Sequence, residues 1–358
     1  TTATLLSQLD FDFFEVLDSV TIARSRKHIQ TYYDVADIGN FPKRNKPISL
    51  RPKLTTRPNA INYKEVYELL SKLHLTIYTP TAFIQPSKLQ KYLSEDETEK
   101  FRSGRELGIQ RLMSINLLKR MESSVHSFLL TVKRIYDYLY DTSHTIDDFI
   151  ATGADNLKEM PDLSSEADEF DYDDQNTDFF NVGKKVKIDL RDMDYISWKR
   201  EIDEDIDNLQ LLILMIEDIT PEYDSKLNEL IRMIREKAAA PINPGNKKIL
   251  IFTAFSDTAE YLYENISGMA LKDLGLHTAL VTGPVDGKTT IPKFKPDMNH
   301  VLACFSPKSK DRDVLYPKDK TDIDILIATD CISEGQNLQD CDYCVNYDIH
   351  WNPVRIIQ

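Results

Sequence analysis

The chain has 358 residues, of which 41% are hydrophobic, so its length allows roughly two domains with a sizeable core. Its formal net charge of −14 argues against a protein that coats nucleic acid by bulk electrostatic attraction. No apolar run approaches the roughly 20 residues that a membrane-spanning helix needs, and no signal peptide opens the sequence. The chain has 4 cysteines, too few and too unevenly placed for a secreted disulfide framework, so a reducing cytoplasm is the expected location.

Two of the cysteines, Cys341 and Cys344, have the spacing of half a zinc site. Neither a second cysteine pair nor a pair of histidines lies nearby in the sequence, so the favoured interpretation is two small residues that flank a buried strand. We therefore expect no metal ligands in this chain.

Basic residues gather near the start of the chain although the whole chain is acidic. Leu5–Ile29 has the apolar spacing of one or two short helices, and the four prolines of Asn40–Asn59 then predict an extended connector. The window from Arg24 to Arg57 contains nine basic residues and only two acidic ones. Arg24, Arg26 and Lys27 are therefore candidates for contact with nucleic-acid phosphates, and the alternative is a solvated helix end.

The middle of the chain has the periodicity of amphipathic helices. A short helix is predicted over Tyr63–Leu75, followed by a strand-like Leu75–Tyr78. Farther along, apolar residues recur at alternating steps of three and four, which predicts one long helix with a buried stripe. Another helix carries Ile202–Ile216, and Pro221 opens a further one. The stripe of the long helix consists of Leu118, Met121, Val125, Phe128, Val132, Ile135 and Leu139.

Acidic residues crowd between Asp141 and Asp178, where aliphatic residues are few. This composition predicts a mobile, solvated loop. Phe170, Tyr172, Phe179 and Phe180 lie in and directly after its acidic end, which suggests the hypothesis that the segment docks on the basic residues near the start of the chain and competes with DNA. The alternative is a disordered insertion.

From Lys248 the pattern changes to alternating strands and helices, which indicates an α/β fold. Pro241, Pro244 and Gly245 mark the boundary. Strands are predicted at four places, the first and third of them buried, and Ser256 is expected to cap a helix. Right-handed crossovers are expected to put the carboxyl end of every parallel strand on one face. The predicted strands are Ile249–Thr253, Thr278–Val281, Ile323–Ala328 and Tyr343–Tyr347.

The segment Gly283–Thr289 superficially has the form of a phosphate-binding loop, since it follows a strand and ends in Gly-Lys-Thr. It has three residues between its glycines where the motif needs four, and Pro292 and Pro296 obstruct the helix that should follow. No Asp-Glu pair ends an apolar strand either. The sequence therefore predicts neither a phosphate cradle nor the usual magnesium carboxylates in this chain.

Two segments near the end of the chain carry a family resemblance. The loop with Thr329, Gly335, Asn337 and Leu338 is followed, at the right separation, by a segment with Tyr347, Asp348, Trp351, Asn352, Pro353 and Gln358. Together they resemble motifs V and VI of superfamily-two helicases, in particular of the Swi/Snf-type DNA-dependent ATPases. Upstream, Lys247–Phe255 resembles motif IV, Asp224–Leu227 resembles the helix start that precedes it, and Val20–Ile29 partly resembles the end of the first lobe.

The resemblance implies a RecA-like second lobe preceded by a largely helical insertion. The implied domains are the end of a first lobe with a connector over residues 1–90, a helical insertion over 91–240 and the second lobe over 241–358. It also implies that ATP and Mg²⁺ lie between two lobes, with the metal ligands in a first lobe upstream of Thr1 and an arginine finger after Gln358. No catalytic residue is then expected within the chain as given.

The same resemblance assigns the implied contacts. Gly335, Asn337 and Gln358 lie on the nucleotide side, whereas Thr253, Thr282, Thr329 and Trp351 lie toward nucleic acid. DNA is the expected partner, with RNA as an alternative. The loop departs from the family pattern at Asp330, Ser333 and Glu334, so individual phosphate contacts do not carry over directly. A non-catalytic lobe kept for binding is the other hypothesis.

Overall fold

The computed structural model describes residues 45–93, 98–152, 188–283, 287–329, 332 and 336–348. The chain divides into two compact units, Thr1–Arg51 and Pro52–Gln358. In the first unit, the described residues 45–51 have no regular secondary structure. The predictions made for Leu5–Ile29, Arg24, Arg26 and Lys27 lie outside the described residues.

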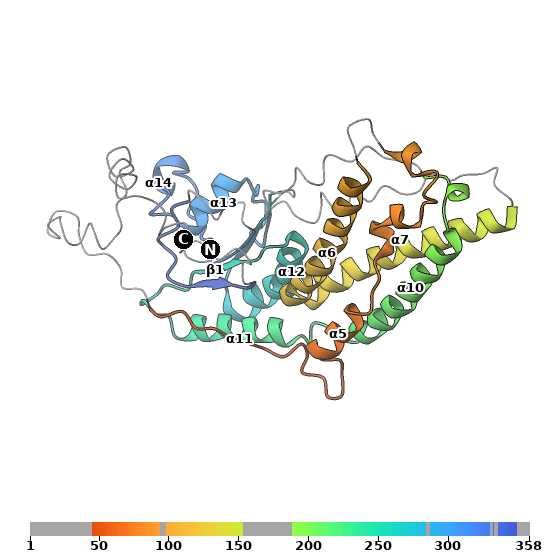
Figure 1. The fold of residues 1–358 in the computed structure, drawn as a ribbon. Coiled ribbons are helices and arrows are strands. Elements are labelled where there is room, and N and C mark those ends of the chain that lie inside the picture. Colours follow the sequence, from red (N-terminus) through yellow and green to blue (C-terminus); the bar gives the residue numbers. More distant parts are fainter. Residues whose placement is uncertain are drawn as a thin grey trace, which may run out of the picture. The chain divides into compact units, whose positions relative to one another are not determined.

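The first part of the second unit is helical (Figure 1). Helices α6, α7 and α10 pack around a core that contains Phe128, Leu139, Trp198 and Leu209, each at most 1% exposed. The apolar stripe of these helices is therefore buried between them. The helices are α5 (Tyr63–Leu70), α6 (Glu99–Ser123), α7 (Val125–Thr152), α10 (Tyr195–Glu217) and α11 (Ser225–Ala239), with short 3-10 turns at Thr76–Tyr78, Pro80–Phe83, Leu89–Tyr92 and Leu190–Asp192.

The predicted single long helix is wrong, because it breaks at Ser124. Its backbone there is extended, with φ −153° and ψ 151°. The Ser124 hydroxyl accepts a hydrogen bond from the Ser127 amide at 3.0 Å, as a helix-capping serine does, so α7 starts afresh. The helical Asp141–Thr152 also contradicts the loop predicted there, and residues 153–187 lie outside the described part.

Two further local predictions need correction. Leu75–Tyr78 contains a 3-10 turn in place of a strand, and Leu75 has a left-handed φ of +51°. The helix expected at Pro221 begins at Ser225, because the Asp224 side chain accepts hydrogen bonds from the first amides of α11. Ser256 is the first residue of its helix and makes no capping bond.

The second part of this unit is a five-stranded sheet with helices on both faces (Figure 1). The strand order is β3-β2-β4-β1-β5, in which β2, β4, β1 and β5 are parallel and β3 is antiparallel. The predicted α/β fold with a mainly parallel sheet after a largely helical region is confirmed. The elements are β1 (Ile249–Phe252), α12 (Ser256–Leu274), β2 (Thr278–Val281), β3 (Lys288–Thr289), α13 (Met298–Phe305), α14 (Arg312–Leu315), β4 (Ile325–Ala328) and β5 (Cys344–Asn346).

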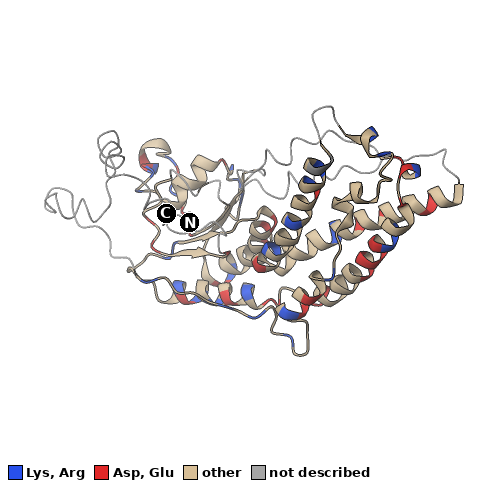
Figure 2. Ribbon diagram, in the orientation of Figure 1, with Lys and Arg blue, Asp and Glu red and all other residues tan. Residues whose placement is uncertain are grey.

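Alternation along the strands divides the core into two layers. Ile251 and Ile327 face α11 and α12, whereas Leu250, Leu326 and Ala328 face α13. Strands β1, β2, β4 and β5 contain no charged residue, and acidic residues instead line α10 (Figure 2). A strand buried on both faces needs apolar side chains on both, which explains the continuous apolar runs in the sequence.

The last two residues of the segment with the form of a phosphate-binding loop form an edge strand of the sheet. Lys288 and Thr289 form β3 and pair with Leu280 and Ala279 of β2. At Gly287 a Cβ atom would come within 2.8 Å of the Pro296 carbonyl oxygen, so the glycine is explained by close backbone packing. The sequence-based rejection of this segment as a phosphate cradle agrees with its antiparallel strand structure.

Candidate functional site

The carboxyl ends of the parallel strands meet in register. Phe252 of β1 pairs with Ala328 of β4, which in turn pairs with Val281 of β2. Thr253, Thr329 and Thr282 are the residues that follow these three, so they stand in a row, and Asp348 follows β5 beside them. We call Thr253, Thr282, Thr329 and Asp348 the strand-end rim. The prediction that the carboxyl ends of the parallel strands lie on one face is confirmed.

The hydroxyl groups of the rim differ in their partners. Thr253, at 2% exposure, donates to Asp348 Oδ2 at 2.5 Å. Thr282 is 6% exposed, and its Oγ1 has no hydrogen-bond partner among the described residues. Thr329 is 7% exposed, and its amide donates to the Val281 carbonyl at 3.3 Å. A buried hydroxyl without a partner is uncommon, so Thr282 is the rim residue whose hydroxyl has capacity left for a ligand.

Asp348 is fixed from three directions. Its Oδ2 accepts from Thr253 Oγ1 and from the Ala254 amide at 2.8 Å, while its Oδ1 lies 3.4 Å from Lys226 Nζ. Lys226 is the second residue of α11, and its ammonium lies 4.1 Å from the centre of the Tyr347 ring. Burial lowers the pKa of Lys226, and Asp348 opposes that shift. The amine therefore depends on its partners to stay charged.

Lys226 also reaches the helical region. Its Nζ donates to the carbonyl oxygens of Glu122 at 2.6 Å and Ser123 at 2.9 Å, which are carbonyls at the end of α6. These carbonyls have no partner within their own helix, so a lysine suits them electrostatically. One side chain therefore connects the end of α6 to the rim.

A second polar contact joins the same two regions. Arg120 of α6 forms an ion pair with Asp257 of α12, and Ser127 Oγ donates to the other carboxylate oxygen at 3.0 Å. Thr258 Oγ1 lies 2.7 Å from Ser123 Oγ and 3.0 Å from Ser124 Oγ. The break between α6 and α7 thus packs directly against the first turn of α12.

Of the residues predicted on the nucleotide side, Asn337 is exposed in the segment that precedes β5. Gly335, Gln358 and Trp351 lie outside the described residues. The described residues do not form a phosphate cradle, and the one rim carboxylate, Asp348, is already held by Thr253 and Lys226. They therefore do not fit a complete site for ATP and Mg²⁺, and the rim by itself supports no chemical step on ATP.

Sequence reasoning did not place Lys226 or Asp348 among the site residues. Asp348 was visible as part of the motif VI-like segment, and Lys226 as part of the Asp-Ser-Lys-Leu sequence at Asp224–Leu227. Their contact joins positions 122 residues apart, which neither local segment indicates.

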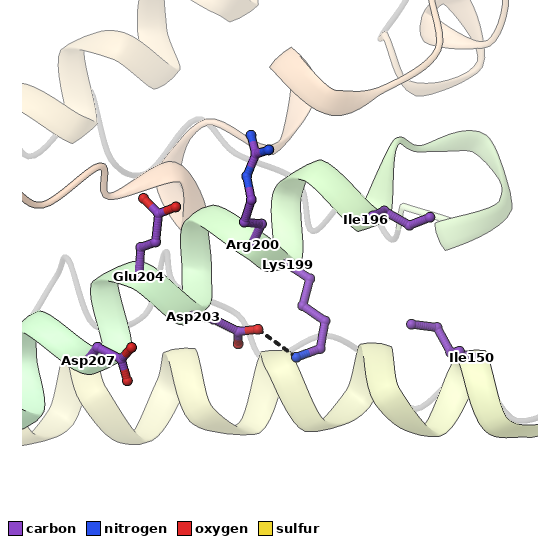
Figure 3. A pocket seen from close by; sticks show the side chains of 7 residues that line it. All are labelled: Ile150, Ile196, Lys199, Arg200, Asp203, Glu204 and Asp207. Carbon is purple, nitrogen blue, oxygen red and sulfur yellow. Dashed lines mark hydrogen bonds and ion pairs between the residues drawn. The ribbon is translucent and has the colours of Figure 1, made fainter.

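A hollow of about 440 Å³ lies away from the rim, between α7 and α10 (Figure 3). Lys199 points from α10 toward α7 and bonds Asp203 at 2.8 Å, and it also lies 3.3 Å from Asp147. The ammonium group of Lys199 is thus already paired with two carboxylates. This hollow gives no reason to move the site from the strand-end rim.

Comparison with known proteins places the rim in a recognised domain. Residues 225–358 match the family model described as helicase conserved C-terminal domain. An uncharacterized ATP-dependent helicase of Bacillus subtilis (strain 168), YqhH, is 24% identical over 176 residues, which are 47% of this chain and 25% of that protein. The chain thus spans about a quarter of that curated relative.

Among solved structures, the helicase domain of Pyrococcus furiosus Hef is similar over 82% of this chain and 48% of its own, at 16% identity and a TM-score of 0.34. That likeness is too distant to support an argument. The sequence match confirms the helicase resemblance at the level of a helicase C-terminal domain over residues 225–358, whereas the Swi/Snf type stays a prediction.

No described helix is both long and apolar enough to cross a membrane.

Proposed function

We propose that this chain supplies the second RecA-like lobe of an ATP-dependent nucleic-acid translocase of the Swi/Snf type. The observation that carries the proposal is the strand-end rim: four parallel strands end in register within residues 225–358, which match the helicase C-terminal domain. Ligands of open α/β sheets bind outside the carboxyl ends of the strands. The rim therefore faces nucleic acid and nucleotide in the proposed complex.

The proposed contacts divide between two sides. Thr253, Thr282 and Thr329, with Trp351, Arg24, Arg26 and Lys27, meet nucleic-acid phosphates, which fixes a strand without reading its sequence. Gly335, Asn337 and Gln358 lie toward ATP, whose phosphates and Mg²⁺ are held mainly by a first lobe. DNA duplex is the proposed track.

The proposed division of the chain follows from these roles. Residues 1–90 contain the end of a first lobe and a connector, residues 91–240 a helical insertion, and residues 241–358 the second lobe. Lys226 of the insertion and Asp348 of the second lobe link these two regions, because their ion pair connects the end of α6 to the rim. We place the proposed translocase in the cytoplasm.

The test compares the 358-residue chain with the protein encoded by the complete reading frame. Hydrolysis of ATP is measured with and without duplex DNA. The 358-residue chain should show no DNA-stimulated hydrolysis, because positioning and charge stabilisation need both lobes, whereas the complete protein should be stimulated. Robust turnover by the 358-residue chain alone would contradict the proposal.

A non-catalytic binding lobe is the second candidate. The observation that favours it is the departure of the motif V-like loop from the family pattern at Asp330, Ser333 and Glu334. It predicts that the complete protein binds nucleic acid and does not hydrolyse ATP. Fluorescence anisotropy with labelled duplex DNA, single-stranded DNA and RNA separates binding from turnover and tests which nucleic acid is preferred.

A further inference from the structure

A compact group of three different ligand-type side chains lies on the α13 side of the lobe. His300 and Cys304 are four positions apart on α13, so they lie on one face of that helix, and Asp319 comes from the segment that leads to β4. One ligand atom from each lies within 4.8 Å of the other two. His300 Nε2 is 2.7 Å from Asp319 Oδ2, and Cys304 Sγ is 3.7 Å from the same oxygen.

The surrounding residues hold these side chains in place. The other carboxylate oxygen of Asp319 accepts a hydrogen bond from the Thr321 amide at 2.8 Å, which orients Oδ2 toward the cluster. The His300 ring stacks between Phe294 and Tyr316, with ring centres 4.4 Å and 4.2 Å away. Partners of this kind, outside the ligands themselves, are what orient ligands in metal sites.

The cluster of His300, Cys304 and Asp319 is buried on one side and reaches solvent on the other. Cys304 is fully buried, whereas the His300 and Asp319 side chains keep 22% and 21% of their exposure. A bound ion would thus have protein ligands on one side and access to water on the other. Three protein ligands and one water form a known arrangement for zinc.

We propose that His300, Cys304 and Asp319 bind one Zn²⁺ ion, with water as the fourth ligand. Nitrogen, sulfur and oxygen donors together suit Zn²⁺, whereas Mg²⁺ and Ca²⁺ prefer oxygen donors alone. In a tetrahedral zinc site the ligand atoms lie roughly 3.3–3.8 Å apart, so the Cys304–Asp319 distance already fits. His300 and Asp319 would separate by about half an ångström when the ion enters.

Protonation sets the condition for binding. Burial, with Asp319 nearby, raises the pKa of the Cys304 thiol to about 12. Zn²⁺ binds a cysteine as its thiolate, so binding of the ion releases the proton of the Cys304 thiol. Arg312 also lies nearby, but its Nη1 is bonded to Asp322 and to the Thr321 carbonyl, each at 2.7 Å, which offsets its charge.

The bound ion would cross-link two segments of the lobe. It would tie α13 to the segment that enters β4, and Thr329 of the rim follows β4 directly. Because an ion that binds only the folded chain stabilises it, Zn²⁺ should raise the melting temperature. This inference does not depend on the proposed ATPase function, since it concerns a different metal and a different face of the sheet.

The test adds Co²⁺ or Zn²⁺ to the purified chain. Co²⁺ should produce a thiolate-to-cobalt charge-transfer absorption that saturates at one ion per chain, and Zn²⁺ should displace it. Cys304→Ser should abolish that absorption, whereas the control Cys344→Ser, at an exposed cysteine on β5, should retain it. No absorption, or absorption lost only in Cys344→Ser, would overturn the proposal.

Two further variants test the site in case Cys304→Ser does not fold. Asp319→Asn keeps the shape of its side chain, and His300→Phe keeps a ring between Phe294 and Tyr316. Each should keep the circular dichroism of the parent and bind Zn²⁺ at least about 100-fold more weakly, because even the loss of an outer partner costs about 10–100-fold. If both fold and bind Zn²⁺ as the parent does, the three residues form only a hydrogen-bonded cluster. Mg²⁺ serves as the control ion and should not raise the melting temperature through this site.

Discussion

Thr282 and Thr278 make the most direct comparison at the scale of single residues. Both are on or next to β2, both are at most 6% exposed, and neither Oγ1 has a hydrogen-bond partner among the described residues. Thr278 begins the strand, whereas Thr282 follows its carboxyl end at the rim. Position along one strand is thus the main difference between them.

We expect Thr282→Val to reduce nucleic-acid affinity by roughly fivefold, since one hydrogen bond contributes about 1 kcal/mol, and Thr278→Val to leave it unchanged. Neither variant should lower stability much, because each replaces an unpartnered buried hydroxyl by a methyl group. Anisotropy titrations and urea unfolding of both variants provide the two readouts. An equal change of affinity in both variants would remove the assignment of Thr282 to nucleic acid.

Three buried tyrosines should make the stability of the folded chain fall at alkaline pH. Burial raises the pKa of Tyr63 to about 12, and it raises the pKa of Tyr261 and Tyr347 as well, with Asp224 adding to all three shifts. Above the ordinary pKa of 10, the unfolded chain loses these protons first, so stability is full below that pH and falls as the pH rises.

Tyr261→Phe should therefore make this alkaline loss shallower, by up to about 1.4 kcal/mol per pH unit. At neutral pH the variant should be less stable by about 1–2 kcal/mol, because the Tyr261 hydroxyl donates to Asp224 at 3.0 Å. Urea unfolding measured from neutral pH to above pH 10 provides both values. Tyr67→Phe, at a tyrosine that is 57% exposed, is the control for the loss of a hydroxyl group and should keep the parent's stability at neutral pH.

At the scale of elements, α11 joins the end of α6 to the end of β5 through Lys226. Lys226→Met keeps an unbranched side chain and removes only the ammonium group, so Asp348 and two carbonyl groups each lose one partner. We expect a loss of about 3–5 kcal/mol in the free energy of unfolding, the usual cost of breaking a buried ion pair.

Arg232 of the same helix provides the control. It pairs with Glu229 and Glu236 at the surface, with 53% of its side chain exposed, so Arg232→Met should change stability by less than about 1 kcal/mol. Similar stabilities of the two variants, measured by urea unfolding, would show that Lys226 does not hold these elements together.

The sequence predicted elements best where a local pattern determines them. The apolar runs that became β1, β2 and β4 are buried on both faces, so their residue types and their structure have the same cause. Strand β5 lies at the edge of the sheet, and its Cys344 and Asn346 are exposed. The break at Ser124 was missed because the apolar stripe continues in phase across it. Its partner, Thr258, is 134 residues away.

The turn before α6 was missed for a similar reason. Leu75–Tyr78 has a strand-like composition, but the carboxylate of Asp205 accepts hydrogen bonds from the His74 and Leu75 amides, each at 2.7 Å. This contact fixes a tight turn and comes from a helix that lies 130 residues later. The contact between Lys226 and Asp348 was missed for the same reason. Each residue lies in a recognisable local motif, but neither motif indicates that the two side chains meet.

At the scale of the whole molecule, the proposal treats the chain as one half of a two-lobed ATPase. The rim lies in the region that matches the helicase C-terminal domain, and the described residues do not build a phosphate cradle. Hydrolysis should then require a first lobe, and its stimulation by DNA should depend on the rim.

The most direct test of this central claim is the rate of ATP hydrolysis by the complete protein, with and without duplex DNA, for the parent and for Thr282→Val. The account predicts that DNA stimulates the parent and that Thr282→Val needs several-fold more DNA for the same stimulation, while its rate without DNA is unchanged. A complete protein that binds DNA and shows no ATP hydrolysis, or a Thr282→Val variant with the parent's DNA dependence, would contradict it.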